Sequence, residues 1–433
     1  MRVACGILPN SMTSPTFMRR RFCQTLVGCA VWIALAAAAQ FSLSAEENVA
    51  VGAVNQFGLA CQRQTRGNAL ISPWSLEQSL GMAYAGSAGE TRAAMGRTLG
   101  YSGDGMKLLA AFRALGEEVR KAKGIDAQTN GLQSANRLFV SERLALKEGW
   151  QKLTSGSFFA EAQAVDFSQS EPAEKIINEW VKAETGGKIP AVIPAGALHP
   201  DAKLVLVNAL SFEMPWEERF TKELTREQPF YVAPAKSKTV PLMFKQHQLR
   251  YARRKGFQIA ALPYAAGAFQ FVVILPDAVD GLPAVEAQLT PQLLTECATL
   301  PLAEVRLSFP RIKMEPPAVA MKPMLTRLGM GIAFGGEANF RGISEADLAI
   351  GEVFQRAFIE MDEDGTKAAA ATATMLIPKN GHPSEVPHET VTTNHPFIFL
   401  VQDCRNGACL FIGRVVDPAP AQPPDTSAPP AKK

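Results

Sequence analysis

Apolar residues recur at helical spacing in the first half of the chain and form continuous runs in the second half. A helical pattern covers residues 72–100, and Ser75 is expected to cap its first helix. A second amphipathic helix is expected over residues 174–189, where the glycines at 186 and 187 would end it. These patterns predict that helices dominate the N-terminal half.

Continuous apolar runs in the second half predict buried strands. The runs lie at residues 203–212, 269–277, 305–312, 352–361, 396–403 and 409–416. Strands and helices do not alternate regularly, which argues against a parallel α/β sheet. The chain is therefore expected to be a mixed α+β protein with large, mainly antiparallel sheets.

The segment of residues 362–381 lies between two of these runs and is rich in small residues. Written as a strand, it places alternate side chains on opposite faces. One face is small and uncharged, so it can enter a sheet without burying an ion. That face carries Thr366, Ala368, Ala370, Thr372, Thr374 and Leu376. Pro378 and Gly381 then indicate exposed loop. The segment can therefore be either an exposed loop or a buried strand, which suggests a conformational switch. The alternative is a flexible linker, which fits the same periodicity.

The N-terminal segment has the composition of an export signal. Three arginines at residues 19–21 precede an apolar run at residues 25–39, and small residues follow it. We expect residues 1–45 to be a signal peptide and the protein to be secreted into the extracellular space or the periplasm. The alternative is a membrane anchor, for which the run is shorter than the ~20 residues that a spanning helix needs.

The formal net charge of +3 reverses its sign once this signal is excluded. Residues 1–45 contain four arginines and no acidic residue, so the remaining chain carries a formal charge of −1. A nearly neutral chain gives no electrostatic reason to expect nucleic acid as a partner. Residues 418–433 are rich in proline and poor in large apolar residues, and a disordered tail is expected there.

The cysteines near the C-terminus suggest a disulfide. Asn406-Gly407 is a preferred centre for a two-residue hairpin turn, which would place Cys404 opposite Cys409. Export permits disulfides, and we predict one between these two residues. The alternative is a pair of free thiols.

The sequence offers no recognisable catalytic machinery. It contains no G-x-S-x-G, H-E-x-x-H or phosphate-loop motif, and no nucleophile–base pair can be proposed. His382 and His388 have no standard ligand spacing, so neither a metal nor a cofactor is expected. A basic cluster at residues 245–255 suits a polyanion, although a solvated strand and turn explains it more simply. We expect that the protein is not an enzyme.

The switch-like segment resembles a known family. "EMDEDGTKAAAAT" is similar to the hinge of the serpins, the serine-protease inhibitors, whose pattern is close to E-E-G-T-x-A-A-A-A-T. Further serpin-like motifs follow in family order along nearly the whole chain. They are "NALISPWSLEQSLGMAYAGSAGETRAAM", "INEWVKAETGGKIPAVIP", "LVLVNALSFEMPWEERF", "ALPYAAGAFQFVVILPD", "LSFPRIKM", "LGMGIAF", "NHPFIFLVQD" and "LFIGRVVDP".

The resemblance implies a fold and a mechanism. It implies a single serpin domain over residues 46–417, with about eight or nine helices and large, mostly antiparallel sheets. It also implies an exposed reactive-centre loop over about residues 363–393. In serpins a protease cuts this loop and becomes an acyl-enzyme. The loop then inserts into the main sheet and distorts the protease before deacylation.

The resemblance also assigns roles to individual residues. Glu363 matches the acid before the hinge glycine, and Arg311 matches its basic partner on a neighbouring strand. Trp216 and Phe220 match the region where insertion begins. Gln355 stands where the family usually has histidine, so this position cannot titrate. The remaining matches in the hinge are Gly365, Thr366, Ala368, Ala369, Ala370 and Ala371, and those beneath the sheet are Ser72, Ser75 and Asn208.

The family's spacing also locates a scissile bond. It lies about fourteen residues after Gly365, at Lys379–Asn380, and a lysine there suits the acidic pocket of trypsin-like proteases. The longer segment downstream leaves room for a shifted bond. The expected partner is therefore a trypsin-like serine protease. We expect the protein to be a monomer that binds no nucleic acid and, after signal removal, no membrane. The alternative is a non-inhibitory serpin that acts as a binding or carrier module.

Overall fold

The computed structural model describes residues 43–101, 105–122, 131–158, 162–366 and 388–418. The predicted signal peptide except its last three residues, Ala368–Ala371, the predicted reactive bond Lys379–Asn380 and nearly all of the proline-rich tail lie outside these residues. Within the described residues, no helix combines the length and the apolar character that crossing a membrane requires.

The helices are concentrated in the N-terminal half of the described chain, as its apolar spacing predicts. They are α2 (Ala45–Arg63), α3 (Pro73–Gly86), α4 (Gly89–Leu99), α5 (Gly105–Lys121), α6 (Glu148–Phe158), α7 (Ser170–Glu184), α8 (Leu282–Gln288), α9 (Pro291–Glu296) and α10 (Lys322–Leu325). Shorter helical turns are η1 (Lys222–Leu224), η2 (Cys297–Thr299), η3 (Thr326–Met330) and η4 (Gly331–Phe334).

Two sheets contain the strands. One has the order β1 (Ala69–Ile71), β16 (Cys409–Val415), β15 (Phe397–Asp403), β8 (Phe269–Pro276), β7 (Phe257–Pro263), β6 (Lys236–Arg254), β9 (Leu302–Pro310) and β14 (Glu389–Thr392), and β5 (Arg226–Ala233) also pairs with β6. The other has the order β10 (Ile312–Met314), β12 (Glu352–Met361), β13 (Gly365–Thr366), β4 (Leu204–Pro215), β2 (Gly131–Ser141) and β3 (Gln163–Val165), and β11 (Val319–Ala320) also pairs with β12.

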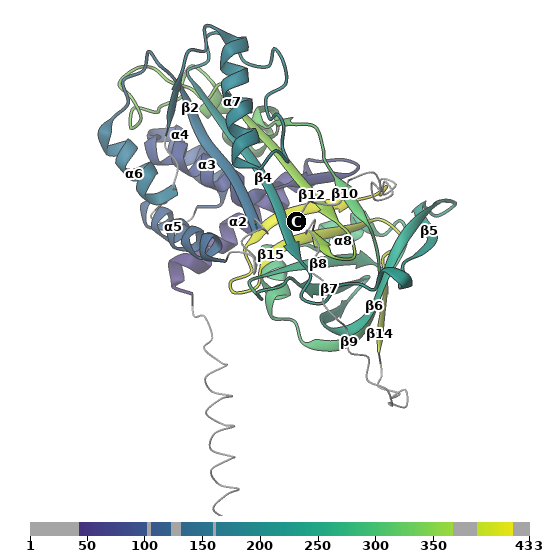
Figure 1. The fold of residues 1–433 in the computed structure, drawn as a ribbon. Coiled ribbons are helices and arrows are strands. Elements are labelled where there is room, and N and C mark those ends of the chain that lie inside the picture. Colours follow the sequence, from purple (N-terminus) through teal and green to yellow (C-terminus); the bar gives the residue numbers. More distant parts are fainter. Residues whose placement is uncertain (1–42, 102–104, 123–130, 159–161, 367–387, 419–433) are drawn as a thin grey trace, which may run out of the picture. The chain divides into compact units, whose positions relative to one another are not determined.

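Most of this strand pairing is antiparallel, which confirms the mixed α+β architecture expected from the sequence. The pair β12–β4 is an exception that matters for the site, because these two strands run parallel. Figure 1 shows α7 lying across β2 and β4, while α2 to α6 gather on one side of the sheets.

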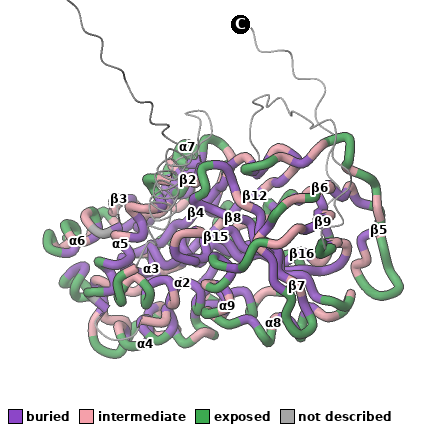
Figure 2. The backbone as a smooth tube through the Cα atoms, turned by 90° about the horizontal axis from the view of Figure 1, so that it is seen from below, coloured by how far each residue is buried: buried purple, intermediate pink, exposed green. Residues whose placement is uncertain are grey.

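The buried side chains explain these layers. Ile177 and Val181 of α7 belong to one buried apolar cluster with Phe139 of β2, Val207 of β4 and Phe354 of β12. Figure 2 shows mostly buried residues along the central strands, with exposed residues gathered toward the outside. Removal of this apolar surface from water favours the layered arrangement.

The helix termini follow local sequence signals with one difference. Ser72, not Ser75, caps α3: the Ser72 side chain accepts a hydrogen bond from the Ser75 N–H, and Pro73 begins the helix. Ser75 is thereby free to direct its hydroxyl group beneath the sheet. Gly186 and Gly187 both have positive φ just after α7, as their predicted role in ending it requires.

The predicted disulfide between Cys404 and Cys409 is wrong, because both residues are free thiols. The turn is longer than the two residues expected. Asp403 donates its N–H to the Ala408 carbonyl (3.0 Å), and Cys409 lies opposite Gln402. Cys404 is therefore part of the loop and does not face Cys409 across the strands.

The two thiols have separate environments. Cys404 Sγ donates toward the Gly267 carbonyl oxygen (3.6 Å), and Cys409 Sγ donates to the Phe411 carbonyl oxygen (3.1 Å). Burial raises the pKa of Cys404 to about 12, with Asp403 adding to the shift, and burial raises the pKa of Cys409 as well. Both residues are therefore protonated at neutral pH, and their thiols are poor nucleophiles.

Candidate functional site

The predicted hinge begins where β12 ends. The chain turns at residues 362–364, with the Asp362 N–H donating to the Gly365 carbonyl oxygen (2.9 Å). Gly365 and Thr366 then form β13, which lies between β12 and β4 and runs antiparallel to both. Both residues of β13 thus already lie in the sheet that contains β12 and β4.

Gly365 is required by this geometry. Its φ is +150°, which side-chain-bearing residues rarely adopt. A Cβ atom at this position would overlap the Met214 carbonyl oxygen and lie 2.5 Å from the Pro215 Cα. Glycine therefore permits the close approach of the hinge to β4.

Thr366 is completely buried, as the uncharged face of the segment predicts. Its hydroxyl oxygen lies 2.7 Å from the Tyr264 hydroxyl oxygen, and this hydrogen bond satisfies both buried groups. The Tyr264 ring stacks on Trp216 with 4.7 Å between centroids. The Trp216 Nε1–H donates to the Asp362 carbonyl oxygen (2.9 Å), which closes the contact from the aromatic pair back to the turn.

Glu363 binds Arg311, the partner that the family resemblance implies. The Arg311 Nε donates to both carboxylate oxygens (3.0 and 3.1 Å) and the Arg311 Nη2 donates to one of them (2.6 Å). The Thr225 hydroxyl also donates to Glu363 (2.6 Å). Burial opposes ionisation, but the hydrogen bonds from Arg311 and Thr225 outweigh it and lower the pKa of Glu363.

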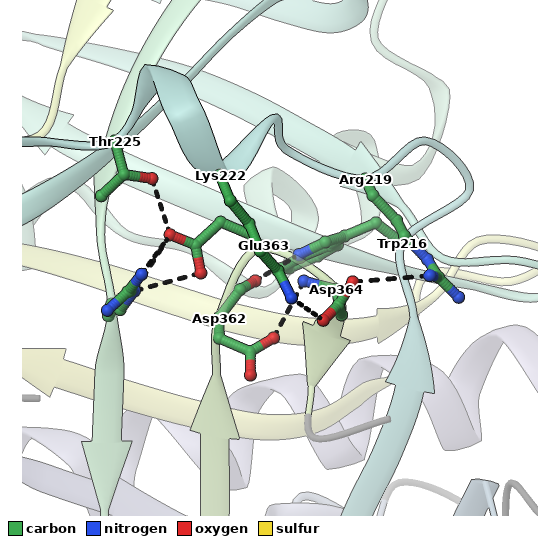
Figure 3. Close-up of polar contacts among 8 residues, drawn as sticks. Trp216, Arg219, Lys222, Thr225, Asp362, Glu363 and Asp364 are labelled. Carbon is green, nitrogen blue, oxygen red and sulfur yellow. Dashed lines mark hydrogen bonds and ion pairs between the residues drawn. The ribbon is translucent and has the colours of Figure 1, made fainter. Parts of the chain in front are cut away.

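Asp364 makes a second set of ion pairs on the other side of the turn, shown in Figure 3. Its carboxylate lies 2.8 Å from the Lys222 Nζ and 3.4 Å from the Arg219 Nη1. The Asp364 main-chain N–H donates to the Asp362 carboxylate (2.9 Å), which stabilises the turn. Burial, together with the neighbouring Asp364 and Glu363 carboxylates, raises the pKa of Asp362.

The predicted polar residues beneath the sheet form one connected cluster. The Gln355 amide donates to the Ser72 carbonyl oxygen (2.9 Å), and the Ser72 hydroxyl donates to a carbonyl oxygen of β16 (2.7 Å). The Ser75 hydroxyl donates to the Asn136 amide oxygen (2.6 Å) and also lies 3.3 Å from that of Asn208. The glutamine, which replaces the family's usual histidine, fits here as both donor and acceptor.

This cluster joins the two strands that a longer insertion would separate. Below β13, β12 and β4 pair directly, and Gln355 lies opposite Asn208 in their register. The Asn208 amide donates across this junction to the Phe354 carbonyl oxygen (3.4 Å). The junction therefore admits the two residues of β13 at one end, and β12 and β4 pair directly over Glu352–Phe358.

Several contributors to the site were not predicted from the sequence. Tyr264 and Arg219 lie within two of the serpin-like motifs quoted above, but neither motif gave them a role, while Lys222 and Thr225 lie in a polar connection that resembles any exposed loop. A structure was needed to show that these residues contact the hinge. No group of three or more potential metal ligands occurs among the described residues.

Comparisons with known proteins agree with this geometry. The family model described as "Serpin (serine protease inhibitor)" matches residues 48–418. The leukocyte elastase inhibitor of Sus scrofa is 35% identical over 378 residues, which cover 84% of this chain and 97% of that protein. Plasminogen activator inhibitor 2 of Homo sapiens is 31% identical over 410 residues, again covering 84% and 97%.

Solved structures give the same result. A highly specific serpin of the insect Tenebrio molitor is 27% identical with a TM-score of 0.75, covering 86% of this chain and 98% of that one. Tengpin, a thermophilic serpin solved in its native state, is 28% identical with a TM-score of 0.75, covering 85% and 94%. The described elements have the serpin architecture that the sequence motifs imply, and the chain belongs to the serpin family of serine protease inhibitors.

Proposed function

We propose that this serpin is a suicide-substrate inhibitor of trypsin-like serine endopeptidases, cleaved after Lys379. Acylation would release the loop from its C-terminal attachment, and insertion between β12 and β4 would then trap the protease before deacylation. In this proposal Glu363, Gly365 and Thr366 form the start of the hinge, and Ala368–Ala371 continue it.

The seating of Thr366 is the observation that carries this proposal. Thr366 is fully buried and pairs with Met361 on one side and Met214 on the other. Continued insertion would extend an existing strand, so it needs no new nucleation event. The small uncharged residues at alternate positions after Thr366 can follow it into the sheet without burying a charge.

Lys379 is the basis for proposing a trypsin-like target. A lysine before the scissile bond complements the acidic specificity pocket of such enzymes. The named relatives differ from one another in the protease that they are named for. One is called an inhibitor of leukocyte elastase and another an inhibitor of plasminogen activator. A protease panel for this chain should therefore contain trypsin, a plasminogen activator and elastase.

Formation of a covalent complex tests the proposal. Each protease is incubated with the protein, and the products are separated by denaturing electrophoresis. A complex that survives denaturation with trypsin, and that Lys379→Ala greatly reduces, is the expected result. Cleavage without any complex would favour the alternative of a non-inhibitory binding or carrier serpin.

We also propose that the protein is exported and acts as a monomer. Ser44 and Glu47 form a capping box at the start of α2, so a mature chain that keeps this cap begins at or before Ser44. The signal would then end slightly earlier than residue 45. N-terminal sequencing of the exported protein and its sedimentation behaviour test these two points.

A further inference from the structure

We infer that Asp364, Arg219 and Lys222 act as a clamp that holds the hinge seated beside β4 and favours trapping of the protease over its release. This inference rests on the proposed inhibitory function. Asp364 is a positioning residue in this scheme, because it acts through the location of Thr366 and does not contact the reacting bond.

The clamp is electrostatic and partly shielded from water. The Asp364 side chain is 17% exposed, that of Arg219 is 27% exposed and that of Lys222 is 62% exposed. The hydrogen bond and charge of Asp364 outweigh the effect of burial and raise the pKa of Lys222, so Lys222 stays charged at neutral pH. Two cations share one carboxylate, and the partial burial of Asp364 reduces screening by salt.

The segment that carries Arg219 and Lys222 is held in place by its own contacts. Arg219 and Lys222 lie in the segment of residues 216–224 that follows β4. The main chain of this segment is held by a hydrogen bond from the Glu217 N–H to the Pro263 carbonyl oxygen (3.0 Å). The Lys245 ammonium group donates to the Glu218 carbonyl oxygen and lies 4.9 Å from the centroid of the Phe220 ring.

The turn is consequently fastened on two opposite sides, as Figure 3 shows. Glu363 binds Arg311, which precedes β10, and Asp364 binds the segment beyond β4. The main-chain hydrogen bonds from the Trp216 N–H to Asp364 and from the Phe220 N–H to Glu363 both come from the segment beyond β4. Loss of the Asp364 charge would leave the β4 side with main-chain contacts and the Trp216 indole bond.

The consequence for inhibition follows from kinetic competition. An insertion that starts from a seated Thr366 has already placed its first residues, whereas an unseated hinge must first enter the sheet. A partly exposed ion pair of this kind biases such an equilibrium by up to roughly fivefold. A bias of that size in the insertion rate would shift the ratio of cleaved inhibitor to trapped protease, while the rate of initial cleavage would not change.

Asp364→Asn is the principal test because it removes the charge while keeping the size of the side chain. The variants Asp364→Asn, Lys222→Gln and their combination form a double-mutant cycle. Asp280→Asn, which changes an exposed acid in the loop after β8, is the charge-matched control. For each protein, trypsin cleavage rate and the number of inhibitor molecules consumed per trapped trypsin are measured.

Hydrogen exchange of the Gly365 and Thr366 amides in the intact protein provides a readout that needs no protease. We expect Asp364→Asn to speed this exchange and to raise consumption of inhibitor by up to about fivefold for each ion pair lost. Lys222→Gln should have a smaller effect in the same direction, and the double variant should resemble Asp364→Asn. The control should match the wild type in both measurements.

Unchanged exchange in Asp364→Asn would overturn the clamp, as would fully additive effects in the cycle. A wild-type protein that traps no protease would instead refute the proposed function. In that event, hydrogen exchange alone still decides whether the clamp holds the hinge.

Discussion

Thr366→Arg should convert the inhibitor into a substrate. In the described structure Thr366 is fully buried, and its hydroxyl group makes a hydrogen bond with the Tyr264 hydroxyl group. An arginine at this position would lose that bond. Its guanidinium group would also have to enter the sheet between Met214 and Met361, neither of which can pair with a cation.

The size of the effect follows from desolvation. Burying a charge without a partner costs several kcal/mol, and leaving the Tyr264 hydroxyl unpaired costs about 1 kcal/mol more. If only about 3 kcal/mol of this appears in the barrier to insertion, insertion slows roughly 150-fold. Deacylation would then overtake insertion in most encounters.

The assay counts the products of those encounters. Thr366→Arg should be cut by trypsin at the wild-type rate, while the denaturation-resistant complex falls to a small fraction. Thr366→Ser keeps the hydroxyl group and the small size, and it should trap protease nearly as well as the wild type. Lys379→Ala tests the other step, because it should lower recognition without changing insertion.

Efficient trapping by Thr366→Arg would refute the reasoning, since it would mean that Thr366 does not need to be buried for inhibition. If Lys379→Ala also left inhibition intact, the reactive bond would lie elsewhere in the loop. Wild-type trapping by Thr366→Ser is needed to attribute the loss to the buried charge.

Three further predictions concern the same region and the thiols. Gly365→Ala should abolish trapping and speed amide exchange of the hinge, because its Cβ overlaps β4; an unchanged inhibitor would contradict the close approach. Glu363→Gln should lower the free energy of unfolding at pH 7 by about 1–3 kcal/mol, by leaving Arg311 without its anionic partner. Since the folded-state pKa of Glu363 is lowered, its contribution is present above its unfolded pKa of about 4.3 and is lost as pH falls further, so pH-dependent chemical denaturation should show the two proteins converging in acid. Cys404 and Cys409 should both react with a thiol reagent in denaturant without reductant, and a linked peptide in mass mapping would disprove this.

The strands of the core could be predicted from sequence because apolar runs report burial directly. The runs at residues 203–212 and 352–361 correspond to β4 and β12, and β12 has the predicted bounds. Helix ends were less certain, because serines three residues apart can both act as caps. Ser72 took that role in α3, while Ser75 was used to link the helix to the sheet.

The site was only partly predictable. The resemblance to the serpin hinge implied the pairing of Glu363 with Arg311, whereas alternation along a single segment identified the buried face of Thr366. The disulfide failed because a favourable Asn-Gly pair does not fix the loop length, and here Gln402 took the position opposite Cys409. Contacts such as that of Tyr264 with Thr366 join residues far apart in sequence and have no local signal.

The parallel pairing of β12 with β4 interrupts the alternation of strand directions in this part of the sheet. β12 runs opposite to β10, and β4 runs opposite to β2, so direction alternates on either side of this junction. A strand inserted between two parallel neighbours can be antiparallel to both of them. β13 has that direction. A strand that continued from β13 would exchange the parallel ladder at Glu352–Phe358 for two antiparallel ladders, which are slightly more stable per residue. The junction between β12 and β4 is thus one strand short of alternating direction, and in the proposed mechanism restoring that alternation would contribute part of the free energy for inhibition.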